Sequence, residues 1–458
     1  MSSSLLIKNA TVISVDDTIG IQMNSDILVQ DGLIKDIGPN LISRHNGEVF
    51  DATDCIVSPG FVDTHHHMWQ QLIRGVTTDW SLANYLDNIR NIYGSLYTPD
   101  DVYTANHFAA LDLINNGITT VIDHCHILNS SKHTDAAIKG LKDAGIRGTW
   151  CYGFYRNPGR SDLPGFDPDI TTPAGFDHQA RRQDAKRARE EHFPENNPEK
   201  QLLTFGGAPT EAEGMTEEAL RDEIDFFRSI GARVVTMHVA IGNYAASSHG
   251  PSFTDSELDL IKNTGSGISA TPETELQMGM GHPIAFRAAE VGCHVGLGID
   301  ITSNQSNDML ALMRLLLQAE RGKRHRENPG TVPIDIQPKS EEALYMATMG
   351  GAKSIGLDHI IGSITPGKRA DLVITRCDDM NVVPVTKPVG ALMYNAHVGN
   401  IDTVLINGKI VKKDGKVVGV DWPKLREDVR TRTARMLDIA AKAPPPSEDS
   451  WTRLLVDP

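Results

Sequence analysis

The residues from about 60 to 300 alternate short apolar runs with amphipathic segments, and this alternation constrains the fold more than any other feature. Seven runs have the composition of strands: residues 60–65, 118–123, 148–154, 201–206, 233–238, 267–271 and 293–300. Amphipathic stretches such as 141–144, 216–230 and 309–318 fit helices between them. Strands that alternate with helices are typical of parallel α/β folds. The sequence therefore predicts a (β/α)8, TIM-like barrel with one strand unaccounted for.

The unaccounted strand is the sixth, which should lie between His238 and Gly267. A strand–helix–strand unit with a parallel crossover needs about thirty residues. Residues 239–248 are too few to hold a helix followed by a strand. We therefore expect a shortened sixth-strand region, and the sequence leaves open whether the shortening is natural or a deletion.

Short strands of alternating polarity occupy both ends of the chain. They lie within residues 1–58 and return at 371–375 and 403–406, with turn residues between them. We expect one small composite β-sandwich built from both ends. The predicted domains are residues 1–58 for the first part of the sandwich, 59–362 for the barrel, and 363–458 for the second part with a C-terminal helix and tail.

The charge and hydropathy of the chain limit the kinds of molecule that it can bind. The 458 residues carry a formal net charge of −15, which opposes binding to nucleic acid or to an anionic membrane because phosphate neutralisation needs a basic surface. No apolar run reaches the roughly eighteen residues of a membrane span, and the first residues lack the pattern of a secretory signal. We expect a cytoplasmic protein with a small-molecule partner, and homo-oligomerisation stays open.

Histidines at predicted strand ends indicate a metal site. Because side chains alternate along a strand, His65 and His67 point to one face and His66 to the other. The ends of barrel strands meet on one catalytic face. Three further strand-end residues are candidate ligands there: His124, His238 and Asp300. Three histidines and one aspartate suit zinc or iron with an open water position, where the metal lowers the pKa of water to about 7.

Several segments carry family motifs. They are residues 59–67 with 72–75, residues 117–123, and residues 343–352 with 361–373. Together they resemble the first strand, the second strand and the closing signature of the amidohydrolase superfamily, in its cytosine deaminase and chlorohydrolase-like (ATZ/TRZ) branch. The resemblance covers nearly the whole chain. It implies a (β/α)8 barrel with a composite β-sandwich and one catalytic divalent metal, zinc in preference to iron.

The resemblance also implies roles for single residues. His65 and His67 match the first-strand ligands, and His238 matches the fifth-strand ligand. Asp300 matches the eighth-strand ligand, which would also act as base toward the metal-bound water. His249 is similar to the sixth-strand histidine that polarises the substrate.

One position departs from the family pattern. Deaminases of this branch carry a proton-shuttling glutamate three residues after the fifth-strand histidine, whereas this chain has Ile241, which cannot transfer a proton. Glu273 and Glu275, after the seventh strand, are candidates for proton transfer or substrate contact, and we rank Glu273 first. Three further residues are expected near the substrate: Trp69, His124 and His126.

The leading prediction is a metal-dependent amidohydrolase. It would hydrolyse a non-peptide C–N bond in a small cyclic or aromatic amine, amidine or amide, as a deaminase does. The missing glutamate leaves a decarboxylase, a hydratase or a C–C hydrolase on the same fold as an alternative. Ile241 and the short 239–248 region also fit a second alternative, a degenerate non-catalytic binding protein.

Overall fold

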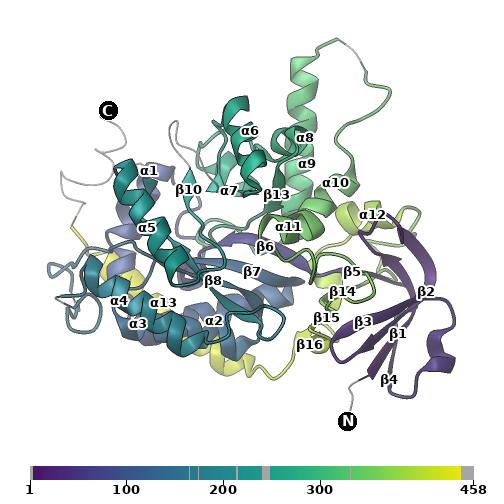
Figure 1. Cartoon of the computed structure of the whole chain (residues 1–458), viewed down its shortest axis with the longest axis horizontal. Helices are drawn as coiled ribbons and strands as arrows, with labels where there is room; N and C mark the ends of the chain where they lie inside the picture. The colour runs from purple at the N-terminus through teal and green to yellow at the C-terminus, as the bar shows by residue number, and fades with distance from the viewer. Residues whose placement is uncertain are drawn as a thin grey trace.

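The computed structural model describes residues 4–164, 166–173, 175–212, 215–239, 248–330 and 332–444, without the side chains of residues 44, 248 and 249. In this part of the chain the strands form two sheets, which lie next to each other (Figure 1). None of the described helices combines the length and the apolar character that crossing a membrane requires.

The larger sheet is parallel throughout. Its order is β10-β11-β12-β13-β6-β7-β8-β9. The bounds are β6 Phe61–His66, β7 Ile118–Cys125, β8 Arg147–Gly153, β9 Leu203–Ala208, β10 His238–Val239, β11 Ser248–His249, β12 Gly267–Ala270 and β13 His294–Leu297. Every residue of β6, β7 and β8 is buried, as expected for a parallel sheet covered on both faces. The seven predicted strands are therefore confirmed, although the fifth is shorter than predicted.

The sixth position in this order is held by β11, which has only two residues. Ser248 pairs with His238 on one side and with Ser269 on the other. The predicted shortening of this region stays a prediction. A cavity of about 460 Å³ lies between residues 233–237 and 265–269. Residues 240–247, among them Ile241, lie outside the described part of the chain.

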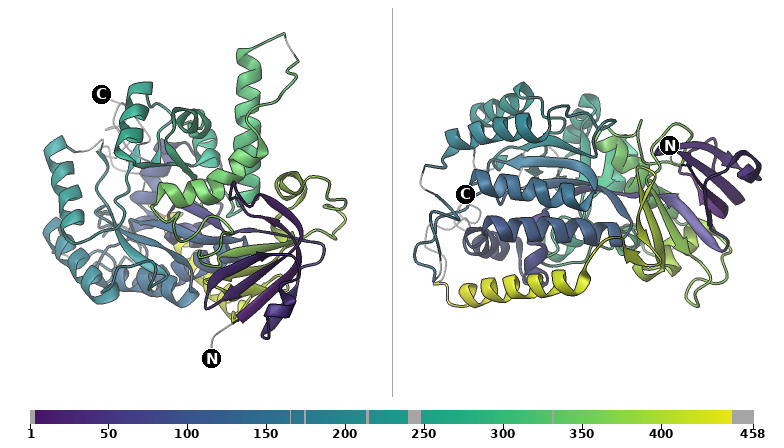
Figure 2. Two further views of the ribbon diagram at one scale, coloured as in Figure 1. Left: turned by 45° about the vertical axis from the view of Figure 1, so that its right-hand side comes forward. Right: turned by 90° about the horizontal axis from the view of Figure 1, so that it is seen from below.

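Helices α1–α8 lie between strands of the larger sheet in the chain, and α9–α13 follow its last strand, β13. Their bounds are α1 Leu82–Tyr85, α2 Pro99–Asn115, α3 Ser131–Ala144, α4 His178–His192, α5 Glu217–Ser229, α6 Asp255–Thr264, α7 Pro272–Gln277, α8 Ala285–Val291, α9 Met309–Glu327, α10 Ser340–Tyr345, α11 Gly351–Ser354, α12 Pro388–Gly390 and α13 Trp422–Ala440. Three helices begin at threonine caps whose hydroxyls accept a backbone N–H: Thr98, Thr216 and Thr254. Figure 2 shows α13 lying along the body of the protein beside α2.

The smaller sheet joins the two ends of the chain. Its order is β17-β16-β15-β14-β5-β1-β2-β3, with β4 paired to β1. The bounds are β1 Ser4–Ile13, β2 Ile21–Gln30, β3 Leu33–Gly38, β4 Glu48–Asp51, β5 Cys55–Pro59, β14 Leu372–Arg376, β15 Ile401–Ile406, β16 Lys409–Lys413 and β17 Lys416–Val417. β5 and β14 pair antiparallel and bring the first and last quarters of the chain side by side. This confirms that both ends build one β unit.

A buried ion pair connects the two sheets. Arg147, at the start of β8, donates from Nε to Asp371 Oδ2 at 2.6 Å and from Nη2 to Oδ1 at 3.0 Å. The exposed fractions of Arg147 and Asp371 are 1% and 4%. Because these two charges are removed from water, each depends on the other for compensation.

Replacing Arg147 by methionine should lower the free energy of unfolding by about 3–5 kcal/mol, because it leaves Asp371 buried without its charge partner. Urea denaturation measures this change. The matched control is Arg221→Met, which removes an exposed pair with Glu217 and should cost about 0–1 kcal/mol. Equal losses in the two variants would contradict a structural role for the buried pair.

Candidate metal centre

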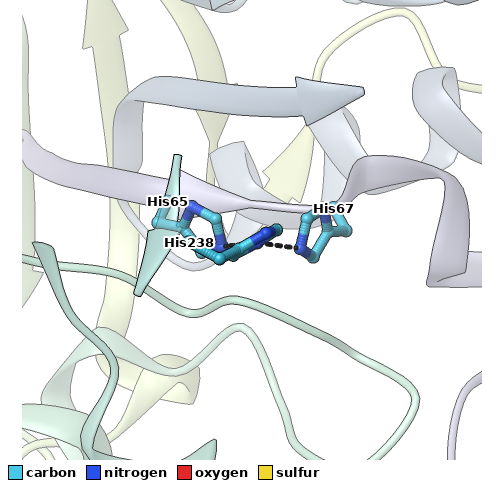
Figure 3. A group of neighbouring side chains, drawn as sticks. All are labelled: His65, His67 and His238. Atoms are coloured by element: carbon cyan, nitrogen blue, oxygen red, sulfur yellow. Dashed lines mark hydrogen bonds between the residues drawn. The ribbon is translucent and has the colours of Figure 1, made fainter. Parts of the chain in front are cut away.

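Three histidines converge at the carboxyl end of β6 and at the start of β10. His65 lies in β6, His67 follows directly after it, and His238 opens β10. The Nε2 atom of His238 lies 3.2 Å from His65 Nε2 and 3.1 Å from His67 Nε2. Figure 3 shows the three rings turned toward one another. One nitrogen from each ring therefore lies within 4.8 Å of the other two.

Asp300 adds a carboxylate to this group. Its Oδ1 atom lies 3.3 Å from His65 Nε2 and 3.4 Å from His67 Nε2. Its backbone is fixed to the same strand, because Asp300 N donates to His65 O and Asp300 O accepts from His67 N, both at 2.8 Å. Asp300 has a φ of 69°, a conformation that costs about 1–3 kcal/mol in a residue other than glycine and is concentrated at functional sites.

Close packing holds the strand of His65 against the residues before Asp300. A Cβ atom on Gly298 would lie 2.9 Å from the Cβ of His65. Glycine is therefore needed at position 298 for this approach.

A histidine can bind a metal only through a ring nitrogen that carries no proton, so the position of the proton on each ring matters. His67 Nδ1 lies 2.7 Å from the backbone O of His124, so this nitrogen carries the proton and Nε2 presents a lone pair. His238 Nδ1 lies 3.0 Å from a carboxylate oxygen of Glu211, so its Nε2 is also unprotonated. Burial lowers the pKa of His65 and His67 below that of a free imidazole, which keeps the rings neutral at pH 7.

Two lone pairs that face each other at 3.1 Å repel unless a cation lies between them. Ligands of a tetrahedral zinc ion with bonds of about 2.0–2.1 Å are separated by about 3.3–3.4 Å. The observed separations of 3.1–3.4 Å match this spacing. The donor set of three imidazoles and one carboxylate therefore fits one divalent metal.

Glu211 and Tyr155 support His238 from behind, and sequence reasoning missed both. The two carboxylate oxygens of Glu211 lie 3.0 and 3.2 Å from His238 Nδ1, and the Tyr155 hydroxyl lies 3.0 Å from it. Burial alone would raise the pKa of Glu211, but the charge and hydrogen bond of His238 and the hydrogen bond of Tyr155 lower it. A carboxylate behind a ligating imidazole fixes its tautomer and increases its basicity. Both could have been found from their positions just after predicted strands, because Glu211 follows β9 by three residues and Tyr155 follows β8 by two.

Replacing Glu211 by alanine should weaken zinc binding about 10- to 100-fold, because His238 loses the acceptor that orients it. Competition with a chromophoric chelator measures the affinity. Glu211→Gln keeps a carbonyl oxygen for the same contact and should lose less. Unchanged zinc affinity in Glu211→Ala would show that the contact does not support the ligand.

His66 lies outside the ligand group, as the alternation of the strand predicted. Its Nδ1 atom lies 2.8 Å from Asp63 Oδ2, and both side chains are fully buried. Asp63 Oδ1 also accepts the backbone N–H of Ile299 at 3.0 Å. The His66–Asp63 pair thus connects β6 to the segment that carries Asp300.

The structure places the three predicted substrate-contact residues of this region beside the ligands. His124 stacks on His238 with ring centroids 4.3 Å apart, and in the described part of the chain neither of its ring nitrogens has a hydrogen-bond partner. His126 lies against His67 with centroids 4.1 Å apart, and its Nδ1 accepts from Trp69 Nε1 at 3.1 Å. Of these three residues, His124 thus has both ring nitrogens without a hydrogen bond in the described part of the chain, whereas Trp69 and His126 hydrogen-bond each other.

The two candidate acids lie in α7, the helix that follows β12. Burial raises the pKa of Glu275 to about 8, with a further contribution from Asp300. Burial raises the pKa of Glu273 to about 7, and its charged neighbour is Asp308. Asp300 thus acts on the pKa of Glu275 and Asp308 on that of Glu273, and the ranking of Glu273 first stays a prediction. The side chain of His249 lies outside the described residues.

A parallel α/β sheet that holds three histidines and an aspartate at its strand ends is typical of metal-dependent hydrolases. A sequence profile of the Amidohydrolase family matches this chain over residues 56–248 and 192–411. The chain belongs to the amidohydrolase family, as its motifs predicted.

Relatives and solved structures agree with this assignment. The chain is 27% identical to the 5-methylthioadenosine/S-adenosylhomocysteine deaminase of Pyrococcus furiosus, over 92% of this chain and 98% of the relative. It is 25% identical to the 5'-deoxyadenosine deaminase of Methanosarcina barkeri, over 93% and 97%. The chain is therefore a hydrolase that acts on carbon–nitrogen bonds other than peptide bonds.

Two solved structures share its fold. A zinc-bound adenosine deaminase from Xanthomonas campestris superimposes with a TM-score of 0.79 at 20% identity, over 95% of this chain and 99% of that one. A zinc complex of atrazine chlorohydrolase from Arthrobacter aurescens superimposes with a TM-score of 0.73 at 20% identity, over 94% and 100%.

Proposed function

We propose that this protein deaminates a small aminoheterocycle of the adenosine type by adding water at the ring carbon that carries the amino group. The observation that carries the proposal is the group of four donors. His238 Nε2 lies 3.1–3.2 Å from the Nε2 atoms of His67 and His65, and Asp300 Oδ1 lies 3.3–3.4 Å from the same two atoms. The deaminases among the relatives support the choice of leaving group.

These four residues are the proposed ligands of one divalent metal, zinc in preference to iron. When bound, the metal lowers the pKa of a coordinated water to about 7 and so supplies hydroxide at neutral pH. The chain itself orients the ligands through Glu211 and the backbone O of His124.

Proton transfer is assigned to carboxyl groups. Asp300 uses one oxygen for the ligand group, and its second oxygen is the proposed acceptor of the water proton. Glu275 is the proposed proton donor to the leaving amine, because a pKa of about 8 leaves it protonated at pH 7. Glu273 is the second candidate. His249 remains the proposed residue that polarises the carbon under attack.

Substrate contact is assigned to the rings around the ligands. The free ring nitrogens of His124 can hydrogen-bond a heterocycle nitrogen, and its stacking on His238 holds it beside the reacting centre. His126 and Trp69, which hydrogen-bond each other, form the adjoining wall.

We also propose that the eight strands close into a (β/α)8 barrel. The support is a parallel bridge between Gly207 and Val235. Gly207 lies in β9, Val235 lies three residues before β10, and β10 and β9 are the first and last strands in the order of the sheet. The proposed domain boundaries are those inferred from the sequence, with the barrel at 59–362 between the two parts of the β-sandwich.

The test is ammonia release by the zinc-loaded protein from adenosine, 5'-deoxyadenosine, 5-methylthioadenosine, S-adenosylhomocysteine, cytosine and an aminotriazine. We expect stoichiometric ammonia and a ring carbonyl product from at least one adenosine-type amine. Release of CO2, or addition of water without ammonia, would instead support a decarboxylase or a hydratase. No turnover of any amine by metal-loaded protein would contradict the proposal.

A further inference from the structure

A second polar cavity, of about 70 Å³, lies beside the loop that follows β8 and the first turn of α4. Its lining is polar and basic: Asn129, Arg156, Asn157, Thr172, Phe176 and Arg181 are among the residues that form it. None of its lining residues is acidic. A cavity of this volume has room for a small polar group.

Arg181 is the buried charge of this cavity. Its exposed fraction is 2%. Its Nη1 donates to the backbone O of Gly153 at 3.4 Å, and its guanidinium lies 5.2 Å from the ring centroid of Phe176. Within the described residues, its Nε has no hydrogen-bond partner. A buried guanidinium without a complete set of acceptors is costly unless a ligand supplies them.

The other polar groups point to the same kind of ligand. The Thr172 hydroxyl is buried and, among the described residues, also lacks a partner. Arg156 brings a second guanidinium, and no ion pair of Arg156 or Arg181 occurs in the part of the chain that the structure describes. Two guanidiniums and a free hydroxyl together match an acceptor-rich anion.

The nearest acid does not neutralise this cluster. Asp184, one turn further along α4, accepts from Arg187 at 2.7 Å, from Thr134 at 2.7 Å and from Tyr152 at 3.0 Å. Burial lowers the pKa of Arg181 to about 10; Tyr152 and Asp184 oppose this change, and Arg90 and Arg156 act in the same direction as burial. Asp184 is thus hydrogen-bonded by three other donors.

We infer that this cavity binds a small oxyanion, in the form of a phosphate, sulfate or carboxylate group, between Arg156, Arg181 and the hydroxyl of Thr172. The site is distinct from the metal centre but connected to it. Asn157 lines the cavity, and its amide donates to the backbone O of His126 at 3.1 Å while its Oδ1 accepts from Arg90. A bound anion would thus hold the loop after β8 against the end of β7.

The experiment is a titration of the zinc-loaded protein with inorganic phosphate and, separately, with acetate at constant ionic strength, followed by thermal unfolding. We expect a saturable rise in Tm with one of the anions, as for any ligand that binds only the folded state. Saturation with phosphate alone assigns a tetrahedral oxyanion, and saturation with acetate alone assigns a carboxylate.

Three variants make the test specific. Arg181→Met and Arg156→Met should each weaken the apparent anion affinity at least about 10-fold, and Thr172→Val removes only the hydroxyl if the arginine variants fold poorly. The control is Arg182→Met on the same helix, whose partner is Asp222; it should keep the wild-type anion affinity. The inference is overturned if neither anion gives saturation, or if the affinity is the same in the wild type and in all three variants. Activity plays no part in the readout, so this result is independent of the proposed deamination.

Discussion

Replacing His65 by alanine is expected to remove the bound metal and to lower kcat/KM by on the order of 1,000-fold or more. His65 supplies one of four closely spaced donors, 3.2 Å from His238 and 3.3 Å from Asp300. Without the metal, water keeps a pKa of about 15.7 in place of about 7, so hydroxide is scarce at neutral pH. Metal content by mass spectrometry and ammonia release measure the two effects.

The matched control is the neighbouring histidine. His66→Ala should keep one metal per chain, because His66 contacts Asp63 and lies outside the ligand group. It should still lower the stability of the fold by about 1–3 kcal/mol, since Asp63 loses a buried partner. If His66→Ala lost the metal and His65→Ala retained it, the face of β6 that carries His66 would be the metal-binding face, contrary to our assignment.

Replacing Asp300 by asparagine should separate metal binding from proton transfer. Three histidines remain to hold the metal, but an amide cannot accept the water proton, and the loss of a positioned base costs about 100- to 10,000-fold in kcat. Steady-state kinetics on zinc-loaded protein measure this loss, with bound metal determined on the same sample. Asp162→Asn, which changes an exposed carboxylate beside Arg160, should leave kcat unchanged. A zinc-loaded Asp300→Asn protein with wild-type kcat would remove Asp300 from the mechanism.

Much of the fold and the three histidines of the candidate metal site could be predicted because they depend on local periodicity. The buried strands β6, β7 and β8 are continuous apolar runs, and the alternation of side chains placed His65 and His67 on one face and His66 on the other. His238 was predicted from its place at a strand end. The histidine group is therefore encoded in strand patterns that a single sequence displays.

Other features could not be predicted because they depend on contacts distant in the sequence. Glu211 acquires its role only where the loop after β9 meets His238, 27 residues later. The helix α4 lies within the polar segment 156–200. That helix has a largely charged sequence, buries small residues such as Ala185 and Ala188, and is stabilised by pairs such as Arg187–Glu191. An apolar stripe, the usual sign of a helix, is absent from it.

The ranking of the two candidate acids shows the same limit. Glu273 and Glu275 are two residues apart, and their sequence positions do not reveal which carboxyl group is coupled to Asp300. In the structure Glu275 is fully buried and accepts the backbone N–H of Thr271 at 2.9 Å. Glu273 instead lies near Asp308, the residue that caps α9.

The central claim is that His65, His67, His238 and Asp300 hold one metal that the hydrolysis of a C–N bond requires. The most direct measurement is the metal content of the purified protein paired with ammonia release before and after chelation. We expect about one zinc or iron per chain, loss of ammonia release on chelation, and recovery of both when the metal is restored. Full ammonia release from metal-free protein, or no metal bound after supplementation, would contradict it.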